Sequence, residues 1–286
     1  MPQSAFKTPE ARRRVLDGYA QTLRSWPIPF ESRQVETHLG PAHLLLCGDD
    51  AAPPLVLLHG GGGNATTWRP NVERLGRTAR LYLLDLPGDA GRSSENRPDS
   101  GSDGHLRWLG EALDGLGLER PSICGASFGG WLALRFAAAH PDRVDRLAAL
   151  APPSLEGMRP SFALAALFAA LVPTDGIARR FYRRISSPNA VPVPEDALAD
   201  FVVRWRSTRP YDPPPRIPDD ELASLPASTL VLLGADDRLF DVHRAAERVR
   251  RLAPAARVEI VPDAGHTLPV DQPEVVDGLL REHFTA

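Results

Sequence analysis

The stretch Gly125-Ala126-Ser127-Phe128-Gly129 lies between a short apolar segment, Ser122–Cys124, and a long apolar segment, Phe128–His140. The first is predicted to be a strand and the second a helix. A G-x-S-x-G sequence in this setting is typical of a sharp strand-to-helix turn that raises the serine hydroxyl above the end of the sheet. Glycine at positions 125 and 129 avoids collisions across so tight a turn. Ser127 is therefore a candidate nucleophile, although serine is also a common helix N-cap residue.

A serine hydroxyl needs a base to take its proton, and a third group must orient that base. Asp236 and Asp237 follow a predicted buried strand over Thr229–Leu233, and His266 follows another over Val258–Val261. The carboxyl ends of parallel strands are where open α/β sheets build their sites. We therefore expect Ser127, Asp237 and His266 to be the catalytic residues. Asp236 is the alternative acid, and we expect whichever aspartate is not used to face solvent.

The negative charge of a tetrahedral intermediate must be met by backbone N–H groups that already point toward it. One expected donor is the N–H of Phe128, at the positive end of the helix that follows the turn. The second is expected from the loop His59–Gly63, with Gly61 as the first choice and Gly62 as the alternative, also assigned to substrate binding. His59 is expected to brace this loop.

Apolar strands and amphipathic helices alternate along most of the chain, which predicts an α/β fold with a mostly parallel, doubly wound sheet. Two strands at the amino-terminal end, Ser32–Leu39 and His43–Cys47, are expected to form a hairpin through Gly40-Pro41. A helix is expected over Thr67–Arg77. Asp85, at the end of the strand Leu81–Leu84, is interpreted as structural.

The alternation stops after Pro153 and resumes near residue 226, and the intervening segment is helical and rich in proline. We therefore expect a core of residues 1–153 and 226–286 with an inserted helical cap of residues 154–225. The apolar stretch Phe162–Leu171 is expected either to pack on the core or to line a pocket.

The composition favours an ordinary globular chain. It has 286 residues, a net charge of −3 and two cysteines, with no metal-ligand spacing among its histidines. Nucleic acid, a membrane and a metal are therefore not expected as partners. The start of the chain lacks an apolar signal segment, and no apolar run approaches the roughly 20 residues that span a bilayer. A cytoplasmic location is expected; the oligomeric state is left open.

These motifs resemble the α/β-hydrolase superfamily over essentially the whole chain. More narrowly, Ala52–Gly60, Leu233-Gly234 with Asp237, and Asp263–His266 followed by Asp271-Gln272-Pro273 resemble bacterial carboxylesterases of the naproxen-ester-hydrolysing (NP) type. The resemblance implies a serine hydrolase that cleaves carboxylic esters without a cofactor. The loop Asp85–Ser93 is one residue longer than the superfamily pattern D-x-x-G-x-G-x-S.

Other chemistries use the same three residues, so a thioesterase, lactonase, C–C hydrolase or acyltransferase acting in a dedicated pathway remains an alternative. An alternative of another class is a small-molecule binding protein that keeps the triad but hardly turns over. The expected substrate is a small-molecule ester, mostly apolar and of small or medium size.

Overall fold

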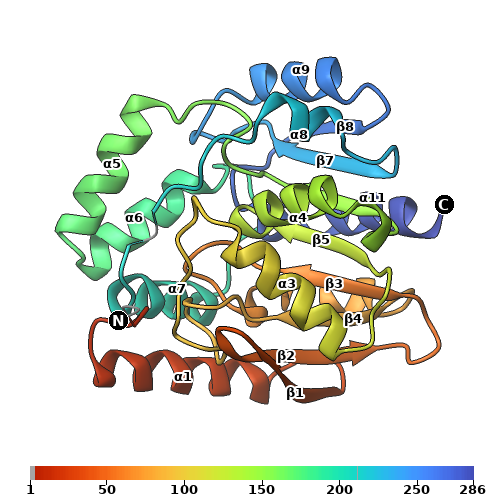
Figure 1. The fold of residues 1–286 in the computed structure, drawn as a ribbon. Coiled ribbons are helices and arrows are strands. Elements are labelled where there is room, and N and C mark those ends of the chain that lie inside the picture. Colours follow the sequence, from red (N-terminus) through yellow and green to blue (C-terminus); the bar gives the residue numbers. More distant parts are fainter. Residues whose placement is uncertain (1–3, 211) are drawn as a thin grey trace.

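The structure, a computed structural model, describes residues 4–210 and 212–286. Its centre is a sheet of eight strands in the order β1-β2-β4-β3-β5-β6-β7-β8 (Figure 1). β2 runs antiparallel to both of its neighbours, and the remaining pairs are parallel. The mostly parallel sheet is thus confirmed. The strands are β1 (Phe30–Thr37), β2 (Gly40–Gly48), β3 (Pro54–Leu58), β4 (Arg80–Leu84), β5 (Ser122–Ala126), β6 (Leu147–Leu150), β7 (Thr229–Gly234) and β8 (Arg257–Val261).

Helices cover both faces of this sheet, as its continuous apolar strands require. In β3, Val56 and Leu58 belong to a core cluster shared with α3, α4 and α9, whereas Leu55 and Leu57 belong to a second cluster shared with α2 and α11. Alternate residues of one strand therefore serve opposite faces, which is the doubly wound arrangement. The helices outside the inserted segment are α1 (Pro9–Arg24), α2 (Val72–Leu75), α3 (Gly104–Gly115), α4 (Phe128–Ala139), α9 (Val242–Leu252), α10 (Leu268–Asp271) and α11 (Pro273–Thr285).

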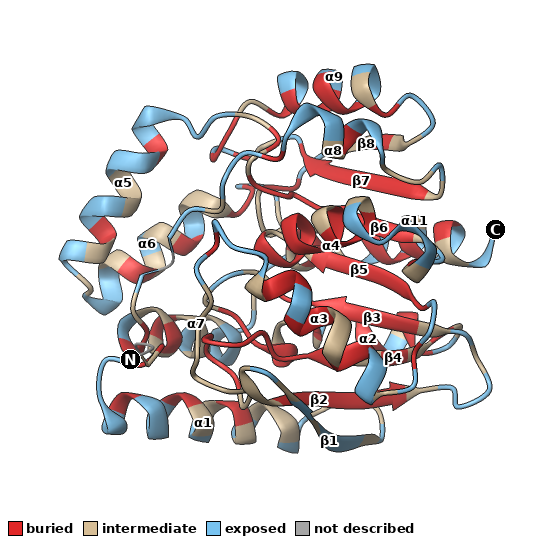
Figure 2. Cartoon of the chain, in the orientation of Figure 1, coloured by how far each residue is buried: buried red, intermediate tan, exposed pale blue. Residues whose placement is uncertain are grey.

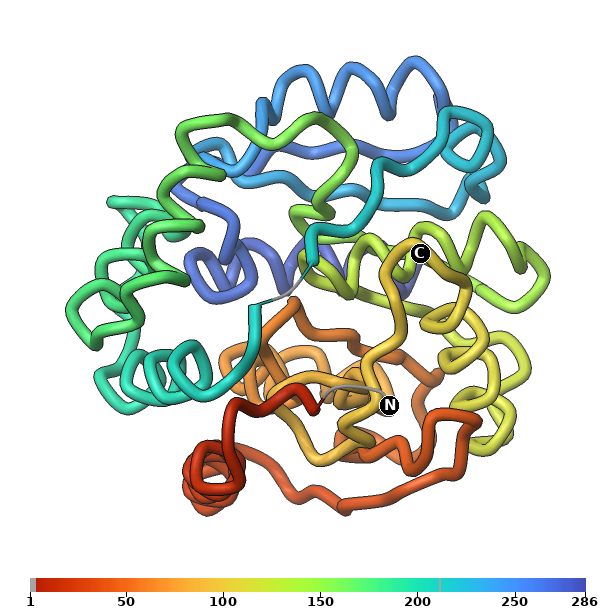
Figure 3. The backbone as a smooth tube through the Cα atoms, turned by 60° about the vertical axis from the view of Figure 1, so that its left-hand side comes forward, coloured from red at the N-terminus to blue at the C-terminus, as the bar shows by residue number. Residues whose placement is uncertain are grey.

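Among the described residues between β6 and β7 there are four helices: α5 (Pro160–Leu171), α6 (Asp175–Ile185), α7 (Glu195–Ser207) and α8 (Asp219–Ala223). α7 packs against α1 and α6, whereas α8 packs against α4 and α9. Figures 1 and 3 show α5, α6 and α7 gathered on one side of the fold, and we call these three helices the cap. The division into a core and an inserted domain over 154–225 remains a prediction.

The apolar stretch predicted over Phe162–Leu171 is α5, and it contacts the core through Phe162 and Ala166. Figure 2 shows most of this helix exposed. Phe162 and Ala169 are its buried residues, while Leu164 and Leu171 are 68% and 72% exposed. Across residues 4–210 and 212–286, no helix combines the length and the apolar character that crossing a membrane would need.

Two local predictions were wrong. The helix expected over Thr67–Arg77 is a 3-10 turn at Ala65–Trp68 followed by the short α2. Pro70 lies between them, and because proline has no N–H it cannot continue the hydrogen-bonded ladder of the turn. The hairpin turns at residues 38–39 rather than at Gly40-Pro41, because Thr37 pairs with Gly40 and the latter already belongs to β2.

The start of α4 packs directly on the end of β3. A Cβ at Gly129 would lie 2.5 Å from the Leu58 carbonyl oxygen and 2.6 Å from that of His59. Real Cβ atoms do not approach backbone oxygens so closely, so only glycine allows this contact. Gly278, in the exposed part of α11, is different, because a Cβ there would meet nothing within 4 Å.

Gly129→Ala should therefore destabilise the protein by about 3 kcal/mol, the upper range for overpacking a filled core. Gly278→Ala, the matched control, should stabilise it by about 1 kcal/mol because alanine is the better helix former. Urea denaturation of the two variants and the parent measures both effects. Equal stability of the Gly129→Ala variant and the parent would contradict the close packing.

Candidate active site

Ser127 occupies the strained turn expected from the sequence. Its φ is +49° and its ψ is −118°, a conformation that residues with a side chain rarely adopt. The turn is held because the Ser127 N–H donates to the Leu150 carbonyl of β6 at 2.7 Å, while the Ser127 carbonyl accepts from the Trp131 N–H at 2.9 Å. The hydroxyl is thereby fixed at the carboxyl end of β5.

Ser127, His266 and Asp237 form one continuous chain of hydrogen bonds. The distance between Ser127 Oγ and His266 Nε2 is 2.8 Å, and that between His266 Nδ1 and Asp237 Oδ2 is also 2.8 Å. Asp237 is buried, and its other oxygen, Oδ1, accepts the Leu239 N–H at 2.8 Å. Three turns far apart in the sequence thus bring together a hydroxyl, an imidazole and a carboxylate.

Two opposing effects set the pKa of the His266 imidazole. Burial favours the neutral ring and lowers the pKa, but the charge and hydrogen bond of Asp237, with a further contribution from the charge of Asp271, raise it more. The net pKa lies above the ordinary value. This favours a ring that readily accepts a proton and holds it beside a carboxylate.

The expectation that the unused aspartate faces solvent was wrong. Asp236 is only partly exposed, and its Oδ2 accepts the Ser187 hydroxyl at 2.6 Å. Its N–H donates to the Ala264 carbonyl at 2.8 Å. Asp236 therefore links the turn that contains Asp237 to two other segments of the chain, one at Ser187 and one at Ala264.

The loop after β3 lies beside Ser127. A Cβ at Gly60 would be 3.2 Å from Ser127 Cβ and 3.8 Å from its Oγ. The Gly62 N–H donates to Asp89 Oδ1 at 2.8 Å, so it is already engaged within the protein. Gly61, the first choice for the second oxyanion donor, is exposed. The Phe128 N–H lies at the first residue of α4, next to Ser127.

His59 braces this loop, as expected. Its Nε2 accepts the Leu86 N–H at 2.9 Å, which leaves the proton on Nδ1, and Nδ1 donates to the Gly60 carbonyl at 2.8 Å. Burial lowers the pKa of the ring to about 4, so it stays neutral at pH 7. A neutral ring is required here, because His59 must both donate and accept.

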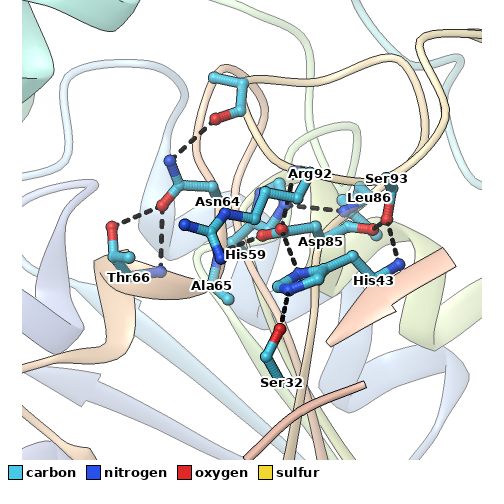
Figure 4. A network of polar contacts seen from close by, with 11 residues as sticks. Ser32, His43, His59, Asn64, Ala65, Thr66, Asp85, Leu86, Arg92 and Ser93 are labelled. Atoms are coloured by element: carbon cyan, nitrogen blue, oxygen red, sulfur yellow. Dashed lines mark hydrogen bonds and ion pairs between the residues drawn. The ribbon is translucent and has the colours of Figure 1, made fainter. Parts of the chain in front are cut away.

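Asp85 is structural, and Figure 4 shows it at the centre of a polar network that includes His59. Its oxygens accept the Ala65 N–H at 2.7 Å, the Arg92 N–H at 2.9 Å and the His43 ring at 2.9 Å. Although burial opposes ionisation, the hydrogen bond and charge of His43, with the other partners, lower the pKa of this carboxyl. The carboxylate therefore ties the loops after β3 and β4 together.

Comparison with known proteins shows the family of this chain. A model of the "Alpha/beta hydrolase family" matches residues 55–278. The chain belongs to this family. Carboxylesterase YbfK of Bacillus subtilis is 30% identical over 95% of this chain and 94% of that protein, and "Uncharacterized carboxylesterase nap" of the same organism is 29% identical over 96% and 93%. The crystal structure of naproxen esterase (carboxylesterase NP) from Bacillus subtilis is similar with a TM-score of 0.86 at 27% identity, covering 97% of this chain and 99% of that one. The resemblance inferred from the sequence motifs is confirmed.

Sequence reasoning did not single out Asp89, whose carboxyl bonds to Gly62 in the loop beside Ser127. It lies in the lengthened loop after β4, is buried, and accepts the N–H groups of Gly62 and Ala90 at 2.8 and 3.2 Å. Burial raises the pKa of its carboxyl to about 7, even though Arg97 and the two N–H groups act in the opposite direction. The extra residue in the loop Asp85–Ser93 was the sequence feature that could have drawn attention to Asp89, because it indicates a loop conformation different from that of the superfamily pattern.

Asp89→Asn should change how stability depends on pH. A raised folded-state pKa means that the folded protein retains a proton which the unfolded chain loses near pH 4, so the contribution of Asp89 to stability declines as pH rises from about 4 to about 7. Asparagine keeps the acceptor for Gly62 and does not ionise. The difference in stability between the variant and the parent should therefore grow in favour of the variant by about 3 kcal/mol between pH 5 and pH 8.

Thermal unfolding at pH 5, 6.5 and 8 measures this gain. Asp17→Asn, an exposed aspartate on α1, is the matched control and should show no such trend. A difference between Asp89→Asn and the parent that stays constant over the three pH values would refute the buried, titrating carboxyl.

Proposed function

We propose that this chain is a serine carboxylesterase in which Ser127, His266 and Asp237 are the catalytic triad. The observation that carries the proposal is the unbroken hydrogen-bond chain between them, with 2.8 Å at each of its two links. Similarity to carboxylesterases over almost the whole chain supports ester hydrolysis.

Catalysis begins when His266 Nε2 takes the proton of Ser127 and Oγ attacks the ester carbonyl carbon. The carbonyl oxygen becomes negatively charged, and the N–H groups of Phe128 and Gly61 stabilise it. His266 then gives the proton to the leaving alcohol, which departs and leaves an acyl group on Ser127. Water, activated by the same imidazole, releases the acid. Asp237 keeps the Nδ1 proton in place and stabilises the charged ring.

The substrate proposed is a small-molecule ester, and the site uses protein groups alone for this chemistry. The acyl group preference, and a cytoplasmic location, stay predictions from the sequence. Thioesters and lactones share the acyl-enzyme route, so a panel of substrates separates these reactions from ester hydrolysis.

Ser127→Ala should lower the kcat for p-nitrophenyl esters by about 10⁶-fold, because the nucleophile is removed and only binding and oxyanion stabilisation remain. Ser224→Ala, an exposed serine on another loop, should behave like the parent. Circular dichroism checks that both variants fold. Retention of a tenth of the parent activity by Ser127→Ala would refute the proposal. Tight ester binding by a parent that neither turns over nor reacts with a fluorophosphonate would instead indicate a binding protein.

The kcat/KM should fall on the acid side as His266 becomes protonated. Because Asp237 and Asp271 raise the pKa of the ring despite its burial, the midpoint of this limb should lie above about 6.5, the ordinary histidine value. Initial rates between pH 5 and pH 9 with one activated aryl ester measure it. A profile that remains flat down to pH 5 would exclude His266 as the base.

A further inference from the structure

The end of α6 crosses both loops that carry the His–Asp pair. Its last residue, Ile185, accepts the backbone N–H of His266 at 2.7 Å. A Cβ at Gly265 would lie 2.5 Å from this same Ile185 carbonyl and 2.9 Å from the Ser187 nitrogen. The segment Ile185–Ser187 is therefore in direct backbone contact with the His266 loop, at a distance that only glycine permits.

Asp271 holds this contact together from within the protein. The residue is fully buried. Its Oδ1 accepts the hydroxyls of Ser186 at 2.5 Å and Thr267 at 2.9 Å, and its Oδ2 accepts the N–H groups of Ser187 at 3.0 Å and Gly265 at 2.7 Å. All four partners donate, as an ionised carboxylate requires. Ser186 and Ser187 directly follow α6, and Gly265 and Thr267 flank His266.

The same segment also reaches the turn of the catalytic acid. The Ser187 hydroxyl donates to Asp236 Oδ2 at 2.6 Å, and Asp236 immediately precedes Asp237. The Asp236 N–H donates to the Ala264 carbonyl at 2.8 Å, which lies two residues before His266. Ser187 thus donates its hydroxyl to a residue beside the acid and its N–H to Asp271, which also accepts the Gly265 N–H in the loop of the base.

We infer that Ser186, Ser187 and Asp271 are positioning residues that fix the His266 loop against the Asp237 turn. We call this set the brace. The inference rests on the proposed triad. Its physical basis is that the 2.8 Å link between His266 and Asp237 joins side chains on two separate turns, so the spacing of those turns sets the alignment of the imidazole. The segment that follows α6 thereby helps to align the imidazole without touching the reacting atoms.

Three variants test the brace. Ser187→Ala removes the bond to Asp236, Ser186→Ala removes one bond to Asp271, and Asp271→Asn removes the charge while replacing one acceptor oxygen by a donor. Because small misplacements of a catalytic group are costly, kcat should fall about tenfold in Ser187→Ala and Ser186→Ala, and about 100-fold in Asp271→Asn, with KM within about twofold of the parent. Ser161→Ala, an exposed cap serine on α5, is the matched control and should not change kcat.

The pH profile adds a readout that a general loss of stability would not produce. His266 is flanked by the carboxylates of Asp237 and Asp271, and the charge of Asp271 helps to raise its pKa. In Asp271→Asn the acid limb of kcat/KM should therefore shift to lower pH, while in the Ser161→Ala control it should not move.

A double-variant cycle tests the link to the acid turn. If Ser187 acts through Asp236, the two substitutions Ser187→Ala and Asp236→Ala remove the same hydrogen bond. The kcat of the double variant should then be no lower than that of the slower single variant. Losses that multiply would overturn this link. Folding of each variant is checked by thermal unfolding, and the serine variants, which keep the charge of Asp271, provide the test should Asp271→Asn fail to fold.

The outcomes separate the brace from the proposed function. Parent-like kcat and an unshifted acid limb in the folded brace variants, together with an inactive Ser127→Ala, would overturn the brace and leave the triad standing. An active Ser127→Ala would remove the triad itself, and the brace with it.

Discussion

Four glycines of the site lie where a carbonyl oxygen is 2.5 Å or less from the position that a Cβ would take: Gly125, Gly129, Gly234 and Gly265. At each of them, two segments of backbone pack against one another without an intervening side chain. The first pair sets the turn around Ser127, and the second pair stacks the end of β7, the His266 loop and the end of α6. Because backbone positions vary less than side-chain rotamers, this close packing fixes the backbone positions of Ser127, Asp237 and His266.

Two buried carboxyl groups near the site, those of Asp85 and Asp89, have pKa values shifted in opposite directions because their partners differ. Asp85 receives two N–H groups and a histidine, and its pKa is lowered despite full burial. Asp89 receives two N–H groups but has one oxygen, Oδ2, that is buried without a hydrogen-bond partner among the described residues, and its pKa is raised to about 7. Burial raises the pKa of both carboxyls, but the hydrogen bond and charge of His43 outweigh it at Asp85, whereas burial prevails at Asp89. Two neighbouring loops are held by one ionised and one readily protonated acid.

The elements that could be predicted from the sequence are those that local chemistry dictates. The Ser127 turn follows from two glycines around a serine, and the positions of Asp237 and His266 follow from the apolar strands that precede them. What could not be predicted depends on segments distant in the sequence. Asp236 was expected to face solvent because its local sequence is that of a turn, but its carboxylate accepts the hydroxyl of Ser187, 49 residues away.

Asp271 illustrates the same limit, because the sequence placed it only within a resembling motif and its four donors come from two separate segments. The three cap helices also differ in how firmly they are held to the rest of the protein. The end of α6 is bonded to the site, and α7 packs on α1. In contrast, α5 buries Phe162 and Ala169 and leaves its three leucines exposed. Local opening is easiest where few apolar groups are buried. Of the three cap helices, α5 is the one that exposes large apolar side chains to solvent, whereas the end of α6 is bonded to the His266 loop.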